Sequence, residues 1–305
     1  MVRTEASVAA SPLAHGMARG LWVEPFAVGQ PCRPEATIRP DFPFISHVVA
    51  FGMGTSTTIE WTEATWNPVR GCSRISPGCT HCYAERMAHR FSGRGQPYEG
   101  LTQVARSGEP RWTGEVRTVP ELLREPLRWR RPRMVFVNSM SDLLHDDVPR
   151  PFIQEVFSVM SQASWHSFQV LTKRPERGEE LSAQLPWPSN VWMGVSVETA
   201  AYVGRISHLR RIPAAVRVLS LEPLLGPIPD LDLDGINWAI VGGESGPGAR
   251  RMDPAWVRRV RDQCLEQRVP FFFKQWGGVR KKAAGRSLDG RTWDQWPTQL
   301  GEAAE

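Results

Sequence analysis

The chain has 305 residues, of which 41% are hydrophobic and 23% are charged. This composition is typical of a globular protein with one large domain or two small ones. No segment approaches the roughly twenty uninterrupted apolar residues that a membrane span requires, so we expect a cytoplasmic protein with no membrane partner. The formal net charge of +5 permits attraction to a polyanion, although a charge of this size is also common in proteins that bind none.

The N-terminal segment differs from the rest of the chain. Residues 1–54 interleave prolines with small residues and show no sustained hydrophobic period, which predicts an irregular, disordered extension. The segment lacks the continuous apolar stretch of a secretory signal, and its glutamates argue against an organellar signal. We expect the main domain over 55–276, followed by a basic, tryptophan-containing tail over 277–305.

Three cysteines follow the first predicted strand, at Cys72, Cys79 and Cys82. Their thiolates can hold three irons of a cubane iron–sulfur cluster, which leaves the fourth iron open to a small molecule that is then reduced. A structural zinc is the alternative, because His81 or His89 can complete a Cys3His set. Disulfides are disfavoured, since a chain of this length can bury its own core. The three cysteines are therefore predicted to be metal ligands.

A basic segment precedes the second long strand. It places Arg124, Arg128, Arg130 and Arg131 around Trp129. Arginine pairs with phosphates and tryptophan stacks on bases, so this segment is a candidate contact for nucleic acid. A solvated basic helix end is the alternative interpretation, and the sequence leaves both open.

Short apolar runs alternate with helical patterns along the rest of the chain. We predict strands at 64–69, 134–138, 168–171, 191–197, 216–221, 238–241 and 270–273. We predict helices at 80–91, 151–163, 176–184, 200–210 and 254–267. In the last helix Cys264 falls at the spacing of the apolar positions and is expected in the core. The alternation predicts an α/β fold, a partial or complete parallel (β/α) barrel with its active site at the carboxyl ends of the strands.

Each predicted strand ends in polar or charged side chains, which should converge at one mouth of the barrel. The candidates along the chain are Asn138, Ser139, Ser141, Asp142, Lys173, Arg174, Ser196, Glu198, Glu222, Glu244 and Lys274. For each one, helix capping or a structural ion pair is the alternative to a role in binding or catalysis. Their repetition at the end of strand after strand favours a functional site.

Three segments carry a resemblance to a known group of proteins. They read Thr-Ile-Glu-Trp-Thr-Glu-Ala-Thr-Trp-Asn-Pro-Val-Arg-Gly-Cys at 58–72, Phe-Phe-Lys-Gln-Trp-Gly-Gly at 272–278 and Gly-Arg-Thr-Trp-Asp at 290–294. From about residue 57 to residue 297 the chain resembles a phage- and bacterium-associated family of uncharacterised function that carries a three-cysteine motif. That family is grouped with the radical S-adenosylmethionine (SAM) enzymes, and its general pattern is similar to that of spore photoproduct lyase, a DNA repair enzyme.

The resemblance implies a [4Fe-4S] cluster, an electron donor, and cleavage of SAM to a 5′-deoxyadenosyl radical that abstracts hydrogen from a substrate, such as damaged or modified nucleic acid. It implies that the loop holding Asn138, Ser139, Ser141 and Asp142 receives the amino group of SAM. Ser196 and Glu198 are then expected at its ribose or carboxylate end. The remaining strand-end residues would face the substrate as catalytic candidates, namely Lys173, Glu222, Glu244 and Lys274.

One feature departs from the radical enzymes that the chain resembles. Those enzymes place three residues between their first two cysteines, whereas six separate Cys72 from Cys79. The longer loop can still wrap a cubane, but it leaves the placement of adenosine open. The rival hypothesis is a non-catalytic nucleic-acid-binding module with a structural Cys3His zinc site, and metal analysis distinguishes the two.

Overall fold

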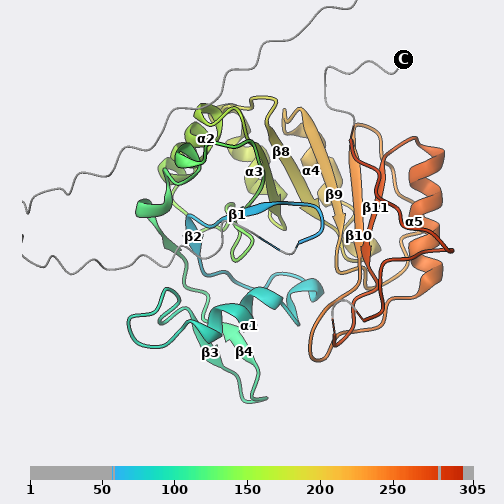
Figure 1. Cartoon of the computed structure of the whole chain (residues 1–305), viewed down its shortest axis with the longest axis horizontal. Coiled ribbons are helices and arrows are strands. Elements are labelled where there is room, and N and C mark those ends of the chain that lie inside the picture. The colour runs from blue at the N-terminus through green and yellow to red at the C-terminus, as the bar shows by residue number, and fades with distance from the viewer. Residues whose placement is uncertain (1–56, 58, 281–282, 298–305) are drawn as a thin grey trace, which may run out of the picture. The chain divides into compact units, whose positions relative to one another are not determined.

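A seven-stranded parallel sheet organises the part of the chain that the computed structural model describes, which is residues 57, 59–280 and 283–297. Its strands, in spatial order, are β1 (Ala64–Trp66), β6 (Met134–Val137), β7 (Ser167–Thr172), β8 (Val191–Ser196), β9 (Val216–Leu221), β10 (Trp238–Gly242) and β11 (Phe271–Gln275). Spatial order follows chain order, as in successive βα units. The sheet is curled (Figure 1). Because no pairing among the described strands joins β1 to β11, the barrel is partial. The predicted fold class is confirmed.

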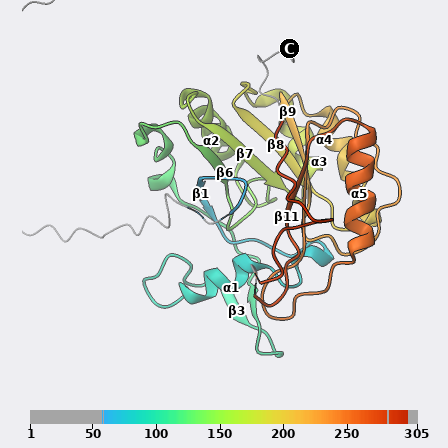
Figure 2. The same cartoon turned by 45° about the vertical axis from the view of Figure 1, so that its right-hand side comes forward.

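Four helices cover one face of this sheet (Figures 1 and 2). They are α2 (Arg150–Gln162), α3 (Pro175–Leu181), α4 (Arg205–Arg211) and α5 (Pro254–Glu266). The main core lies between these helices and the sheet, and it includes Val137, Val170 and Val241 from alternate strand positions. Because successive side chains of a strand point to opposite faces, the intervening residues face the inside of the partial barrel.

Aromatic side chains fill the inner face toward the amino ends of the strands. Trp192, Trp238 and Phe272 form edge-to-face pairs there, with ring centroids 6.2 Å and 5.7 Å apart. Trp61 packs on Phe136 in the same cluster. β8, β10 and β11 are buried on both faces, which explains their continuous apolar sequences. The inside of the barrel is therefore packed at one end, and its polar residues lie at the other.

A small layer that the sequence did not predict lies between α1 (Tyr83–Arg90) and β6. It contains a hairpin of β3 (Thr102–Val104) and β4 (Pro110–Trp112), and β5 (Arg117–Thr118) pairs with β2 (Val69–Arg70). Its core is a separate apolar cluster that includes Tyr98, Leu101 and Trp112. The strands are only two or three residues long, which is too short for a periodic pattern to be recognised.

Helix boundaries differ from the prediction at the strand-to-helix connections. The helix predicted from residue 80 begins at Tyr83, because Cys82 has extended backbone angles (φ −60°, ψ 124°) and caps it. A 3-10 turn, Pro77–Cys79, precedes it. The helix predicted from residue 200 begins at Arg205 after a 3-10 turn at Ala200–Tyr202. Among the described α-helices, only α5 has a side-chain N-cap, because the Asp253 side chain accepts a hydrogen bond from the Ala255 N–H.

The C-terminal segment packs against β11. Leu288 and Trp293 are buried in the main core, and the Phe273 N–H donates to the Trp293 carbonyl at 2.9 Å.

The expected extension over 1–54 lies outside the described residues. Among the described helices, none is both long and apolar enough to cross a membrane.

Candidate functional site

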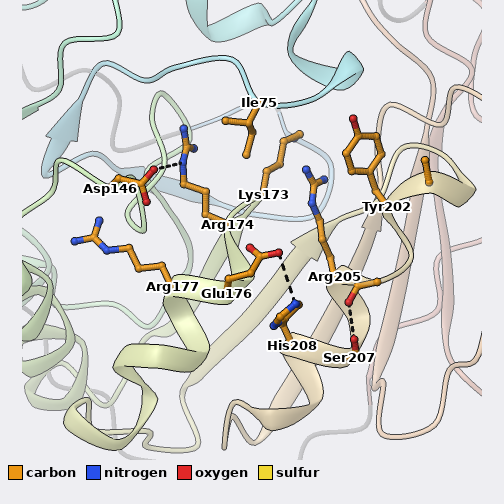
Figure 3. A pocket seen from close by; sticks show the side chains of 12 residues that line it. Ile75, Asp146, Lys173, Arg174, Glu176, Arg177, Tyr202, Arg205, Ser207 and His208 are labelled. Atoms are coloured by element: carbon orange, nitrogen blue, oxygen red, sulfur yellow. Dashed lines mark hydrogen bonds and ion pairs between the residues drawn. The ribbon is translucent and has the colours of Figure 1, made fainter.

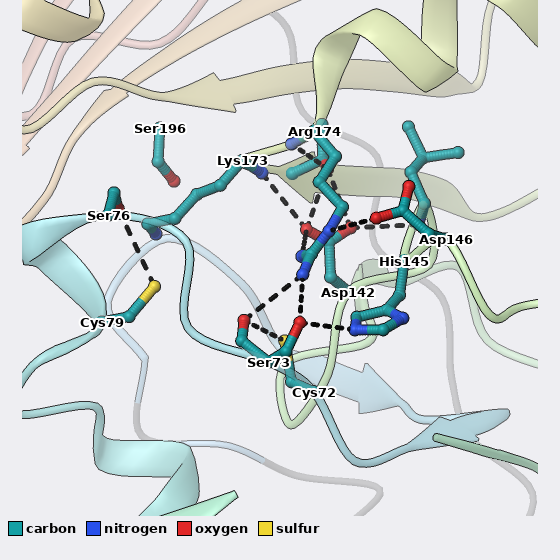
Figure 4. Close-up of polar contacts among 12 residues, drawn as sticks. Cys72, Ser73, Ser76, Cys79, Asp142, His145, Asp146, Lys173, Arg174 and Ser196 are labelled. Atoms are coloured by element: carbon teal, nitrogen blue, oxygen red, sulfur yellow. Dashed lines mark hydrogen bonds and ion pairs between the residues drawn. The ribbon is translucent and has the colours of Figure 1, made fainter. Parts of the chain in front are cut away.

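The cysteine loop, residues 71–82, lies across the carboxyl ends of the sheet. Gly71 pairs with Ser141, which follows β6. Further along the loop, side chains contact residues after β7, β8 and β10, through the pairs Ser73–Arg174, Ser76–Glu198 and His81–Glu244. Figure 4 shows the loop facing these strand ends. The fold therefore brings the predicted cysteines and the predicted strand-end residues to one site.

The three cysteines form no disulfide, and they lie close enough for Cys79 to influence the pKa values of Cys72 and Cys82. Burial, and to a smaller extent Asp142, Cys82 and Cys79, raise the pKa of Cys72 to about 12, although the Arg174 guanidinium acts in the opposite direction. Burial also raises the pKa of Cys82. Among the described residues, no three His, Cys, Asp or Glu side chains converge closely enough to hold a metal. Metal loading would thus require the thiols to lose protons and turn toward one another.

The donor set nevertheless fits a cluster with three protein ligands. Thiolates are the protein ligands of iron–sulfur clusters, and Cys72, Cys79 and Cys82 are the cysteines of one short loop. The loop is held along its length, since the Arg74 guanidinium pairs with the buried Glu85 and the Arg250 guanidinium donates to the Pro77 carbonyl at 2.8 Å. A pre-positioned loop reduces the entropy cost of gathering the ligands.

Asp142, expected near the cofactor, is fully used by the protein. Its carboxylate accepts hydrogen bonds from the Thr172 hydroxyl at 2.8 Å, from Arg174 Nη1 at 3.1 Å and from the Leu144 N–H at 3.0 Å. A buried carboxylate with these partners has its hydrogen-bonding capacity met within the protein. Its observed role is to orient Arg174, whose Nη2 donates to the Ser73 hydroxyl at 2.7 Å.

Ser73, His145 and Asp147 have the residue types of a hydrolytic triad. Their hydrogen bonds, however, place the donors and acceptors differently from those of a catalytic triad. The Asp147 N–H donates to His145 Nδ1 at 3.2 Å, so the proton of the neutral ring is on Nε2, which donates to the Ser73 hydroxyl at 2.7 Å. Burial and the nearby Arg174 lower the pKa of His145, which keeps it neutral. His145 therefore anchors Ser73 and does not act as its base.

The polar residues after β6 mainly hold neighbouring segments. The Ser141 hydroxyl donates to the Val69 carbonyl at 2.9 Å, and the Ser139 hydroxyl donates to Asn67 Oδ1 at 3.2 Å. Asn138 adopts a positive φ of 58°, and its Oδ1 accepts from the Val69 N–H. Its Nδ2 is buried and meets no acceptor among the described residues, so this amide retains a donor for a ligand.

Glu198 is fully buried at the end of β8 and links three elements. It accepts hydrogen bonds from the Ser76 hydroxyl at 2.5 Å and from Arg205 Nη1 at 2.9 Å, and Lys173 Nζ lies 3.8 Å away. Ser196 is also buried, and its carbonyl accepts a hydrogen bond from Arg205 Nη1 at 2.7 Å; Figure 4 draws it together with Lys173, Ser76 and Cys79. Lys173 therefore lies on the barrel side of this part of the cysteine loop, whose Pro77 carbonyl accepts a hydrogen bond from the Arg250 guanidinium.

The other catalytic candidates form ion pairs. Lys274 Nζ lies 2.6 Å from Glu222 Oε1, and both are largely buried. Burial raises the pKa of Glu244, but hydrogen bonds from Arg250 and His81 outweigh it and lower the value to about 2. Glu244 is thus a carboxylate at neutral pH and is not a proton donor. Its glycine neighbour serves packing, since a Cβ on Gly243 would lie 2.0 Å from the Trp276 carbonyl oxygen.

The basic segment lies at the opposite edge of the sheet. It directly precedes β6, whereas the cysteine loop crosses the carboxyl ends of the strands. Arg124, Arg128, Arg130 and Arg131 are exposed. Trp129 is only 8% exposed and packs in the main core, so its ring is not available to stack on a base. Any contact with nucleic acid there rests on the arginines.

Sequence reasoning missed several side chains that anchor the cysteine loop, namely Ser73, Ser76, His145, Arg205 and Arg250. Ser73 and Ser76 lie between the first two cysteines, and this position in the sequence could have identified them as part of the site. The others are far away in sequence and reach the loop only through the fold.

A family profile described as "Protein of unknown function (DUF5131)" matches residues 56–297. Among the curated proteins, no relative matches the chain. A solved structure of a mutant spore photoproduct lyase aligns over 68% of this chain and 61% of its own length, at 13% identity and a TM-score of 0.38. The aligned part therefore spans less than two thirds of that protein.

Proposed function

We propose that this chain, which belongs to the DUF5131 family of proteins of unknown function, is a radical SAM-type enzyme that binds a [4Fe-4S] cluster through Cys72, Cys79 and Cys82. The observation that carries the proposal is the position of the cysteine loop over the carboxyl ends of a partial parallel (β/α) barrel. That edge is where barrels of this type build their active sites. When bound and reduced by an electron donor, such a cluster supplies the electron that cleaves SAM to a 5′-deoxyadenosyl radical.

The protein's own residues suit this chemistry. The aromatic cluster of Trp192, Trp238 and Phe272 closes the inner face at one end and keeps water out of that part of the barrel. Asn138 Nδ2 offers an unused donor to a polar group of SAM. Lys173 and the Lys274–Glu222 pair place charge on the inner side of the strand ends, where a polar substrate can be oriented. A damaged or modified nucleic acid is the proposed substrate class.

Zinc remains the second candidate because of one contact. His81 Nδ1 pairs with the Glu244 carboxylate at 2.9 Å, and a carboxylate at one ring nitrogen is the arrangement found behind many zinc-bound histidines. With the three cysteines, His81 would complete a structural Cys3His site. The proposed module would then bind nucleic acid through its exposed arginines without catalysis.

Metal and sulfide analysis after anaerobic purification tests the proposal. We expect about four irons and four sulfides per chain, with broad visible absorption. Replacing Cys72, Cys79 or Cys82 with Ala should abolish cluster binding, because each removes one of three ligands. Cys264→Ala is the matched control and should keep the iron, since Cys264 is buried in the main core.

Two outcomes would overturn the assignment. Unchanged iron content in all three variants would show that the cluster, if present, is held elsewhere. One zinc per chain in a colourless protein, lost in His81→Ala as well as in the cysteine variants, would establish the zinc site instead.

A further inference from the structure

A cavity opens beside the cysteine loop, on the side of α3 and α4. Its volume is about 600 Å³, within the usual range for sites that bind small molecules. Figure 3 shows Lys173, Arg174 and Arg205 extending toward Ile75 of the cysteine loop. The lining residues that matter below are Ile75, Lys173, Arg174, Arg177, Tyr202 and Arg205. We call this cavity the rim pocket.

The rim pocket is rich in cations that are buried or half-buried. Arg174 and Arg205 are each 7% exposed, and the carboxylates that pair with them, Asp142 and Glu198, do not line the cavity. The acidic side chains that do line it, Asp146 and Glu176, are 78% and 62% exposed. Carboxylates so open to solvent compensate nearby charge weakly. The wall of the pocket therefore presents guanidinium and ammonium groups, and the buried carboxylates that pair with Arg174 and Arg205 lie behind them.

Two guanidinium nitrogens at this pocket lack acceptors. Arg174 Nε and Arg177 Nη1 are buried, and neither has a hydrogen-bond partner among the described residues. The Asp146 carboxylate is 3.8 Å from Arg174 Nε, which is too far for a hydrogen bond. A buried donor without an acceptor is costly, and an anionic oxygen that reaches it recovers a charge-assisted bond. The unused donors point to an anion with several oxygens.

We propose that the rim pocket binds the phosphoryl group of a nucleotide, either free or within a nucleic acid strand. Arginine forks match the geometry of phosphate oxygens, and Lys173 adds a further cation. Ile75 and the Tyr202 ring provide an apolar wall for the sugar and base. No cysteine lines the pocket, so the proposal does not depend on which metal the cysteine loop binds. It also places phosphate recognition at the carboxyl edge, away from the basic segment.

Calorimetric titration at low ionic strength tests this proposal on the full-length protein. The ligands are AMP, adenosine and a single-stranded tetranucleotide. AMP should bind at least tenfold more tightly than adenosine, because only AMP carries the phosphoryl group. Arg177→Met should weaken AMP binding about tenfold or more, and Arg177→Lys, which keeps the charge, should weaken it less. Arg210→Met is the matched control, since Arg210 lies on α4 outside the pocket and should leave binding unchanged.

The tetranucleotide distinguishes the two sources of phosphate. Affinity equal to that of AMP identifies a pocket for free nucleotides, whereas affinity at least tenfold tighter, falling with salt, identifies a strand. Equal binding of AMP and adenosine would overturn the proposal. So would oligonucleotide binding that survives Arg177→Met but is lost when Arg130 and Arg131 are replaced with Ala. Iron content measured on the same samples reports on the cluster separately.

Discussion

Gly78 is one of the positions at which the cysteine loop packs tightly against the barrel. A Cβ at this position would lie 2.4 Å from Glu198 Oε1 and 2.6 Å from its Cγ. Glu198 cannot move aside, because it is fully buried and held by Arg205 and Ser76. Gly78→Ala should therefore lower the free energy of unfolding by about 1–3 kcal/mol, as overpacking does in cores. Urea denaturation followed by circular dichroism measures it.

Gly226→Ala is the control for that substitution. Its new Cβ would meet Thr199 Cγ2 at 3.6 Å, an ordinary contact. We expect a change within about 0.5 kcal/mol, typical of a site away from such features. Equal effects at both positions would show that Gly78 is not packed tightly against Glu198.

At the scale of elements, α3 and α4 are joined by Glu179, which pairs with Arg211 and His208. Hydrogen bonds from Arg211 and then His208 lower the pKa of Glu179 from 4.5 to about 2. A carboxyl group whose pKa is lower in the folded state stabilises the protein at pH values above its pKa in the unfolded chain. This stabilisation is lost as the pH falls to its pKa in the folded state. Glu179→Gln should thus lower the melting temperature at pH 6, and the difference should shrink from about pH 4.5 downward.

Calorimetry at several pH values checks this, with Glu180→Gln as the control. Glu180 is exposed on the same helix and forms no ion pair with another described residue, so its replacement should change little. A Glu179→Gln difference that stays constant between pH 6 and pH 2.5 would contradict the role given to its charge.

For the whole molecule, the C-terminal segment completes the main core. Trp293 is 7% exposed and packs edge-to-face on Phe271, with ring centroids 5.7 Å apart. Trp293→Ala should cost about 3–5 kcal/mol, because it leaves a large cavity. Trp296, three residues later, is 43% exposed and stacks on Trp238 at 4.6 Å. Trp296→Ala should cost only about 1 kcal/mol.

Urea denaturation measures the free energy of unfolding of both tryptophan variants. A cost for Trp293→Ala no larger than that for Trp296→Ala would show that the segment only covers the surface. The same measurement bears on truncation, since a chain ending at residue 276 would lose Leu288 and Trp293 from the core.

The sequence by itself determined the seven parallel strands and the covering helices. Strands such as β8 and β10 are continuous apolar runs because they are buried on both faces, and such runs can be recognised without tertiary information. It also identified the three cysteines, since their spacing is local. It missed the hairpin of β3 and β4, whose strands are too short to show a period.

Only the tertiary structure decided what each strand-end side chain does. Asp142, Glu198 and Glu244 were all candidates for ligand contact, yet each is satisfied by an arginine, and two of those arginines, Arg205 and Arg250, were not predicted. The reason is physical: a buried carboxylate needs a cationic or hydrogen-bonding partner, and that partner can come from anywhere in the chain that the fold brings near. Sequence spacing places a polar residue at the mouth of the barrel, but only packing determines whether it faces a ligand or another side chain.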